Sequence, residues 1–130
     1  MSLTIGWSDR TKRILAVDDS KTMRDMVSFT LKKAGFDVAE AEDGKAALNV
    51  LTGGKFDLII TDLNMPNMDG ISLIKSVRAG SQHRTVPILI LTTESDGAKK
   101  ADGKAAGATG WLVKPFNPDQ LIATVNRVCP

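Results

Sequence analysis

Short apolar runs alternate along the chain with longer amphipathic stretches. Three of the five runs are continuous rather than alternating, which is typical of strands that are buried on both faces of a parallel sheet. We therefore expect five short strands, most of them in the interior of a sheet. The runs lie at residues 13–17, 36–41, 57–61, 87–91 and 110–113.

Between these runs, apolar residues recur at intervals of three and four, the spacing of an amphipathic helix. Asp19 or Ser20 is placed to cap the first helix. Asn117, Pro118 and Gln120 mark the start of the last helix as a cap, a first-turn proline and the partner of a capping box. The expected helices lie within residues 23–34, 47–51, 71–77, 98–106 and 118–128.

Strands that alternate regularly with helices predict right-handed crossovers and an α/β fold. In such a fold, a parallel sheet carries helices on both faces. The ligand site of an open parallel sheet lies at the carboxyl ends of its strands, where the strand order reverses. The residues that follow the strands are therefore the candidates for a functional site.

Composition narrows the class of protein. The chain has 130 residues, the size of one domain, and its 17 Lys and Arg against 15 Asp and Glu give a net charge of +2. This charge is too mild to predict binding to nucleic acid or to an anionic membrane. The single cysteine, Cys129, excludes an internal disulfide. No apolar run is long enough for a membrane span or a signal peptide, so we expect a cytoplasmic protein. We also expect a monomer, with a polar tail (1–11) before one domain (12–130).

Polar side chains follow four of the five predicted strands. Asp18 and Asp19 come after the first strand, Asp62 after the third, Thr92 after the fourth and Lys114 after the fifth. Taken singly, each has an ordinary structural explanation, such as a helix cap, a turn residue or a solvated loop charge. Their joint placement at one edge of the predicted sheet favours a functional site instead.

Electrostatics indicates what such a site would bind. Two carboxylates about 4 Å apart repel by roughly 4 kcal/mol at an effective dielectric near 20, and one lysine cannot balance three of them. Carboxylates with open water positions suit Mg²⁺. A metal ion and Lys114 around a free carboxylate form a site for a phosphoryl group, with Asp62 as the nucleophile and Thr92 as a hydrogen-bond donor.

Several motifs in this sequence resemble the signature of response-regulator receiver domains, and especially of the stand-alone chemotaxis members. The motifs are residues 17–20, 62–70, Thr92 and 114–116, with Asp19 to Arg24 favouring the chemotaxis members. They occur in the family's order and spacing, and the resemblance runs from about residue 12 to the end of the chain. It implies a flavodoxin-like fold with strand order 2-1-3-4-5.

The resemblance also implies roles for individual residues. Asp62 would accept a phosphoryl group from the phosphohistidine of a sensor histidine kinase or from a small donor such as acetyl phosphate. Asp19, Asp62 and the main-chain carbonyl of Asn64 would bind Mg²⁺, while Asp18 would hold it partly through water. Lys114 would contact the phosphoryl group.

The resemblance also implies how the conformation of the domain would change on phosphorylation. Thr92 would move toward the phosphoryl group and Trp111 would turn inward, although Trp is larger than the usual Tyr or Phe and is equally explained as a packing residue. The Lys114–Pro115 peptide bond would be cis. The surface made by the fourth helix, fifth strand and fifth helix would then change.

Three further positions bear on the lifetime of the phosphorylated state. The resemblance assigns Asn64 and Glu94, two residues after Asp62 and Thr92, to positions that tune dephosphorylation. Both match a pattern that favours a short lifetime. Thr93 stands where the family favours a smaller residue, and its methyl group could slow the access of donor or water.

The leading hypothesis is a single-domain response regulator of a two-component phosphorelay, most simply in chemotaxis, that catalyses only its own phosphorylation and dephosphorylation. Because the chain stops just past its fifth helix, its output would be binding to a flagellar motor switch protein or another protein, and a phosphatase could act on it. A phosphate sink or a receiver of another pathway remains an alternative.

Two other classes are less favoured. A metal-dependent phosphohydrolase would need an acid-base aspartate where this chain has Asn64. A flavodoxin-like cofactor binder is not supported by the glycine pattern. Of the remaining residues, His83 is expected to be solvated, and Met65 and Met68 are expected to serve local packing.

Overall fold

Strands and helices alternate strictly in the computed structural model, which describes residues 11–93 and 97–129. The strands are β1 (Arg13–Val17), β2 (Asp37–Ala41), β3 (Leu58–Asp62), β4 (Ile88–Thr93) and β5 (Gly110–Lys114). The helices are α2 (Lys21–Lys33), α3 (Gly44–Thr52), α4 (Gly70–Ala79), α5 (Gly97–Ala106) and α6 (Pro118–Val128). Every expected strand and helix is present, with boundaries that shift by up to three residues.

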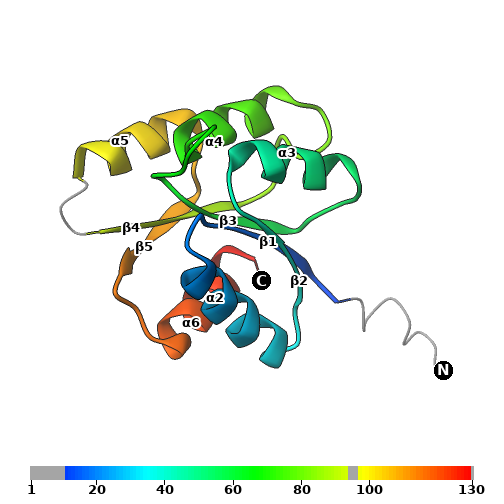
Figure 1. Cartoon of the computed structure of the whole chain (residues 1–130), viewed down its shortest axis with the longest axis vertical. Coiled ribbons are helices and arrows are strands. Elements are labelled where there is room, and N and C mark those ends of the chain that lie inside the picture. Colours follow the sequence, from blue (N-terminus) through cyan, green and yellow to red (C-terminus); the bar gives the residue numbers. More distant parts are fainter. Residues whose placement is uncertain (1–10, 94–96, 130) are drawn as a thin grey trace.

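The five strands form one parallel sheet in the order β2-β1-β3-β4-β5. This order confirms the flavodoxin-like topology. Helices α3, α4 and α5 cover one face of the sheet, and α2 and α6 cover the other (Figure 1). β1 and β3 lie side by side in the interior of the sheet, so residues that follow these two strands emerge next to each other.

The hydrophobic core has two layers, one on each face of the sheet. In β1, Leu15 and Val17 belong to the layer under α3 and α4, whereas Ile14 and Ala16 belong to the layer under α2 and α6. All four side chains are buried. Because both faces of the inner strands are covered, their sequences read as continuous apolar runs, and this is why the pattern predicted them.

Capping residues fix the helices beside the site. The Ser20 side chain accepts a hydrogen bond from the backbone N–H of Met23, so Ser20 rather than Asp19 caps α2 and the Asp19 carboxylate stays available. At the start of α6, Asn117 and Gln120 form the predicted capping box.

The loop between β3 and α4 is held tightly against its surroundings. A side chain at Gly70 would collide with the carbonyl oxygen of Asp62, so only glycine allows the start of α4 to pack on the end of β3. The Gly70 N–H donates to the Leu63 carbonyl at 2.9 Å. Asn67 adopts φ 67° and its amide donates to the Asp43 carboxylate at 2.7 Å. These contacts fix the backbone on both sides of Asn64.

His83 corrects one expectation from the sequence. The residue is 8% exposed rather than solvated, and its Nε2 accepts a hydrogen bond from the Phe56 N–H at 3.2 Å. Burial lowers the pKa of His83, and a backbone hydrogen bond at Gly54 opposes this shift only in part. The single histidine therefore ties the α4–β4 connection to the loop before β3. Met65 and Met68 do pack against the core, as expected.

The buried imidazole predicts a pH dependence of stability. Since the pKa of His83 is lower in the folded protein than in the unfolded chain, the unfolded chain takes up the proton first as the pH falls. The free energy of unfolding should therefore fall on acidification from about pH 7.5 to about pH 5.5, below the usual histidine pKa. Urea unfolding of the wild type and of His83→Gln, which keeps an acceptor for the Phe56 N–H, should show a steeper fall in the wild type. Equal slopes for the two proteins would contradict this prediction.

Candidate functional site at the carboxyl ends of the strands

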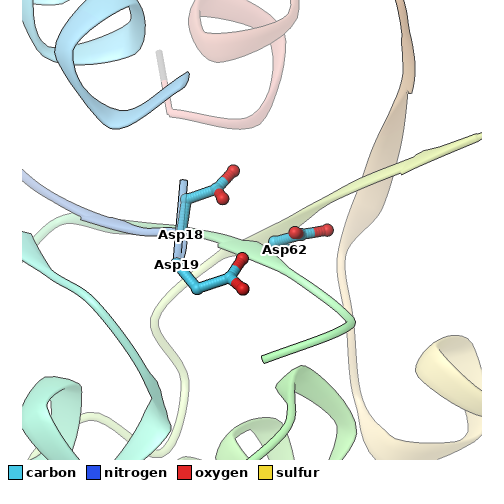
Figure 2. Close-up of side chains that lie close together, drawn as sticks. All are labelled: Asp18, Asp19 and Asp62. Atoms are coloured by element: carbon cyan, nitrogen blue, oxygen red, sulfur yellow. The ribbon is translucent and has the colours of Figure 1, made fainter. Parts of the chain in front are cut away.

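Three carboxylates meet where β1 and β3 end. Val17 pairs with Thr61 in the parallel register, so the residues that follow them, Asp18 and Asp62, come to the same edge of the sheet. Asp19 is next in the chain, and one carboxylate oxygen from each of the three residues lies within 4.8 Å of the others. Figure 2 shows the three side chains close together at the ends of the two strands. The sequence-based expectation that they lie together is correct.

Lys114 brings a positive charge to the same edge from β5. Its Nζ lies 3.4 Å from Asp62 Oδ1 and 3.8 Å from Asp18 Oδ2. The lysine side chain is 22% exposed and therefore reaches into the cluster rather than into solvent. The following peptide bond, Lys114–Pro115, is cis, as expected.

Asp18 is the most buried of the three acids, with 3% of its surface exposed. Its Oδ1 accepts a hydrogen bond from the Ser20 N–H at 2.9 Å, whereas its buried Oδ2 has no hydrogen-bond partner within the described chain. Burial raises the pKa of Asp18, and the charges of Asp62 and Asp19 raise it further, while the Ser20 N–H and Lys114 act in the opposite direction. The balance is an excess of negative charge around an unsatisfied oxygen.

This arrangement fits a small divalent cation. Three carboxylates face one ammonium group, so the cluster has more negative than positive charge. Mg²⁺ binds oxygen ligands and keeps several waters, and it requires only one or two carboxylates from the protein. Asp19 is exposed and Asp62 half-buried, so both can reach an ion that is open to solvent.

Thr92 lies at the same edge, one strand further. Leu91 of β4 pairs with Asp62, so Thr92 is the next residue toward the carboxyl end. The threonine is 2% exposed, and its hydroxyl lies 3.4 Å from the Thr93 carbonyl. Thr93 itself is exposed, whereas Glu94 falls outside the described residues.

Trp111 faces outward from β5. Its side chain is 40% exposed, and the ammonium of Lys100 on α5 lies 6.0 Å from the ring centroid. Trp111 pairs with Ile90, two residues before Thr92 in the neighbouring strand. The structure thus shows the tryptophan in an outward position beside α5, separate from the carboxylates.

Two residues at the site make contacts that the sequence does not predict. Arg24 of α2 donates to the main-chain carbonyl of Asp18 at 2.8 Å and pairs with Glu40 at 3.3 Å, so it holds the backbone of the β1–α2 loop. Lys99 of α5 donates to the side-chain oxygen of Asn64 at 2.5 Å. Arg24 lies within the motif that carries the resemblance, but nothing in the local pattern indicates which groups either side chain reaches.

Comparison with known proteins identifies the family. The sequence-family model of the response regulator receiver domain matches residues 14–126 of this chain. The chain is 38% identical over 121 residues to chemotaxis protein CheY-3 of Vibrio cholerae serotype O1, covering 92% of this chain and 93% of that protein. It is 39% identical over 117 residues to chemotaxis protein CheY of Pseudomonas aeruginosa, covering 89% and 94%.

Solved structures agree with this result. The chemotaxis response regulator CheY4 of Vibrio cholerae is 53% identical, with a TM-score of 0.87, over 92% of this chain and 99% of that chain. A putative response regulator from Chloroflexus aurantiacus is 36% identical, with a TM-score of 0.88, over 92% and 98%. Fold, sequence and the acidic pocket therefore agree, and the chain belongs to the response regulator receiver domain family, with relatives of the CheY type.

Proposed function

We propose that Asp62 is the phosphoacceptor of this receiver domain and that the domain works as a phosphorylation-controlled binding switch. The observation that carries the proposal is the position of the Asp62 carboxylate, which lies 3.4 Å from the Lys114 ammonium and beside Asp18 and Asp19. A carboxylate in this setting has both a cation to steady a phosphoryl group and neighbours that can hold a metal ion.

In the proposed reaction, a carboxylate oxygen of Asp62 attacks the phosphorus of a phosphohistidine on a sensor histidine kinase. A P–O bond forms, the P–N bond breaks, and its electron pair leaves with the imidazole nitrogen, which is protonated by water. With acetyl phosphate as the donor, the leaving group is acetate. Lys114 orients the phosphoryl group and offsets part of its charge. The domain thereby catalyses its own phosphorylation and, when a water attacks the phosphorus and the Asp62 carboxylate leaves, its own dephosphorylation.

The ligands that we propose for Mg²⁺ are the carboxylates of Asp19 and Asp62 and the main-chain carbonyl of Asn64, with Asp18 holding the ion partly through water. When bound, Mg²⁺ neutralises charge on the phosphoryl oxygens. The unsatisfied Oδ2 of Asp18 supports this assignment, because a coordinated water would supply the missing hydrogen bond.

Switching would follow from the new charge. A phosphoryl group adds about −1.5 to −2 charges at one point, and it favours whichever state of the domain offers it better contacts. Thr92 and Lys114 are the groups that would make those contacts, and Trp111 would report the change at the surface. Differential contacts of about 3 kcal/mol would shift the ratio of the two states roughly 150-fold.

The lifetime of the switched state would be set next to the acceptor. Asn64 lies two residues after Asp62 in the fixed β3–α4 loop, from which its side chain can orient an attacking water. We assign the same tuning role to Glu94. Thr93 follows Thr92 and is exposed at the end of β4, and we propose that its methyl group limits the approach of donor or water.

The output that we propose is protein binding in chemotaxis, with a sensor histidine kinase as donor and a flagellar motor switch protein as a partner. The names of the relatives from Vibrio cholerae and Pseudomonas aeruginosa support this pathway. The proposed receiver unit is residues 12–130, acting as a cytoplasmic monomer and open to a phosphatase. Among the described residues, no helix combines the length and apolar character that a membrane crossing needs.

Removing the buried charge of Asp18 should make the fold more stable but weaken the binding of Mg²⁺. Asp18→Asn keeps an oxygen for the Ser20 N–H but abolishes repulsion among the carboxylates, so the free energy of unfolding without Mg²⁺ should rise by about 1 kcal/mol. The affinity for Mg²⁺ should fall at least about tenfold, since an anionic partner of the metal is lost. Urea unfolding in EDTA and calorimetric Mg²⁺ titration measure the two effects. Asp102→Asn removes an exposed charge of α5 and is the matched control. The assignment would be contradicted if Asp18→Asn were destabilised and its affinity for Mg²⁺ were unchanged.

Phosphorylation should depend on one carboxylate. Incubation with Mg²⁺ and acetyl phosphate should raise the intact mass of the wild type by one phosphoryl group and leave Asp62→Asn unchanged, because an amide cannot form the acyl phosphate. Asp69→Asn, in the same loop, keeps the capping oxygen of α4 and should react as the wild type does. A wild type that never gains the phosphoryl group would end the proposal, as would modification of Asp62→Asn.

Binding should depend on the phosphoryl group. A peptide of a flagellar motor switch protein should bind the phosphorylated domain at least about tenfold more tightly than Asp62→Asn, the change expected for about 1.4 kcal/mol of coupling. Lys114→Arg should fold and bind weakly, because a planar guanidinium does not replace a point ammonium. Fluorescence anisotropy measures both. Equal affinities with normal phosphoryl uptake would favour a phosphate sink or a receiver of another pathway.

A further inference from the structure

The side chain of Asn64 is held by a residue of α5. Its Oδ1 accepts a hydrogen bond from Lys99 Nζ at 2.5 Å, and the two residues are 35 positions apart in the chain. Both side chains lie at the exposed side of the site, where the β3–α4 loop faces the first turn of α5. The contact therefore joins the loop that follows the phosphoacceptor to the helix beside Trp111.

The chemistry of an asparagine side chain makes this contact consequential. The amide has one acceptor oxygen with two lone pairs and one donor nitrogen, and the ammonium of Lys99 takes one of those lone pairs. A hydrogen bond from a charged donor is stronger than one between neutral groups. The Asn64 oxygen that could accept a hydrogen bond from a water near Asp62 is thus held by α5, and this contact restricts the direction in which its other lone pair can point.

We infer that Lys99 is a positioning residue that restrains the Asn64 amide and thereby lengthens the life of phosphorylated Asp62. The inference rests on the proposed function, since it concerns the hydrolysis of that acyl phosphate. In hydrolysis, the water oxygen attacks phosphorus, the bond between phosphorus and the Asp62 oxygen breaks, and its electron pair returns to the carboxylate. The proton of the water passes to the departing inorganic phosphate. Asn64 only orients the water, by accepting a hydrogen bond from it, and its amide can turn toward that water once the hydrogen bond from Lys99 is broken.

A direct electrostatic effect of Lys99 on the phosphoryl group is the alternative explanation, and it differs in one respect. An effect of charge would persist without the Asn64 amide, whereas an effect of positioning requires it. The chain also offers a matched lysine on the same helix, because Lys104 is exposed on α5 and has no contact with Asn64.

The test measures the loss of the phosphoryl group from the purified chain after the donor is removed, by intact mass over time with Mg²⁺ present. Lys99→Met should shorten the lifetime about two- to fivefold, the range expected for one exposed contact to a charged group. Lys99→Arg retains donors and should stay near the wild type. Lys104→Met should leave the lifetime unchanged. In an Asn64→Ala background, Lys99→Met should have no further effect.

Several outcomes would overturn the inference. They are an unchanged or longer lifetime in Lys99→Met, the same shortening in Lys104→Met, and an equal effect of Lys99→Met with and without Asn64. Because Lys99 is exposed, thermal melts should show that these variants fold as the wild type does. A wild type that takes up no phosphoryl group overturns the proposed function and this inference with it, whereas normal uptake with any outcome above overturns the inference alone.

Discussion

Repulsion among carboxylates at the carboxyl edge of the sheet is the constraint on which the site depends. Two such groups about 4 Å apart cost roughly 4 kcal/mol at an effective dielectric near 20, and this cluster contains three. A flexible chain would separate them. Here, the buried pairing of β1 with β3 prevents separation, and Arg24 and Gly70 fix the backbone next to Asp18 and Asp62. Core packing therefore supplies the free energy that holds the acids together.

One ammonium group does not balance the charge of the three carboxylates, and the remaining negative charge makes the cluster favour a cation. Lys114 contacts both Asp18 and Asp62, yet the pKa of Asp18 is still raised. The pocket therefore fits a divalent cation, and the phosphoryl group that we propose for Asp62 would be favoured there only together with such a cation, because it is itself negative. Stability is sacrificed at the place where we propose that the chemistry occurs, while the side chains at the centre of the two apolar layers are buried.

The sequence predicted the parts of this structure that depend on local patterns. Continuous apolar runs revealed the inner strands, and strand ends located Asp18, Asp62 and Lys114, because parallel strands bring their carboxyl ends to one edge. It did not predict contacts between distant side chains. The burial of His83 against Phe56 and the hydrogen bond from Lys99 to Asn64 depend on how helices and loops from distant parts of the chain pack against one another. Neither a single histidine in a polar loop nor one lysine of an adjacent pair indicates such a partner by its sequence.

Helix α5 links the acidic pocket to the outer surface through two successive residues. Neighbours on a helix point about 100° apart, so Lys99 can reach Asn64 while Lys100 lies over Trp111. A movement of α5 must therefore alter both contacts together. Coupling between two sites is reciprocal, so in the proposed switch whatever favours one arrangement of Trp111 would also change the restraint on Asn64. The surface that would bind a partner and the residue that would govern hydrolysis are then connected by a single turn of helix, without any need for a longer path through the core.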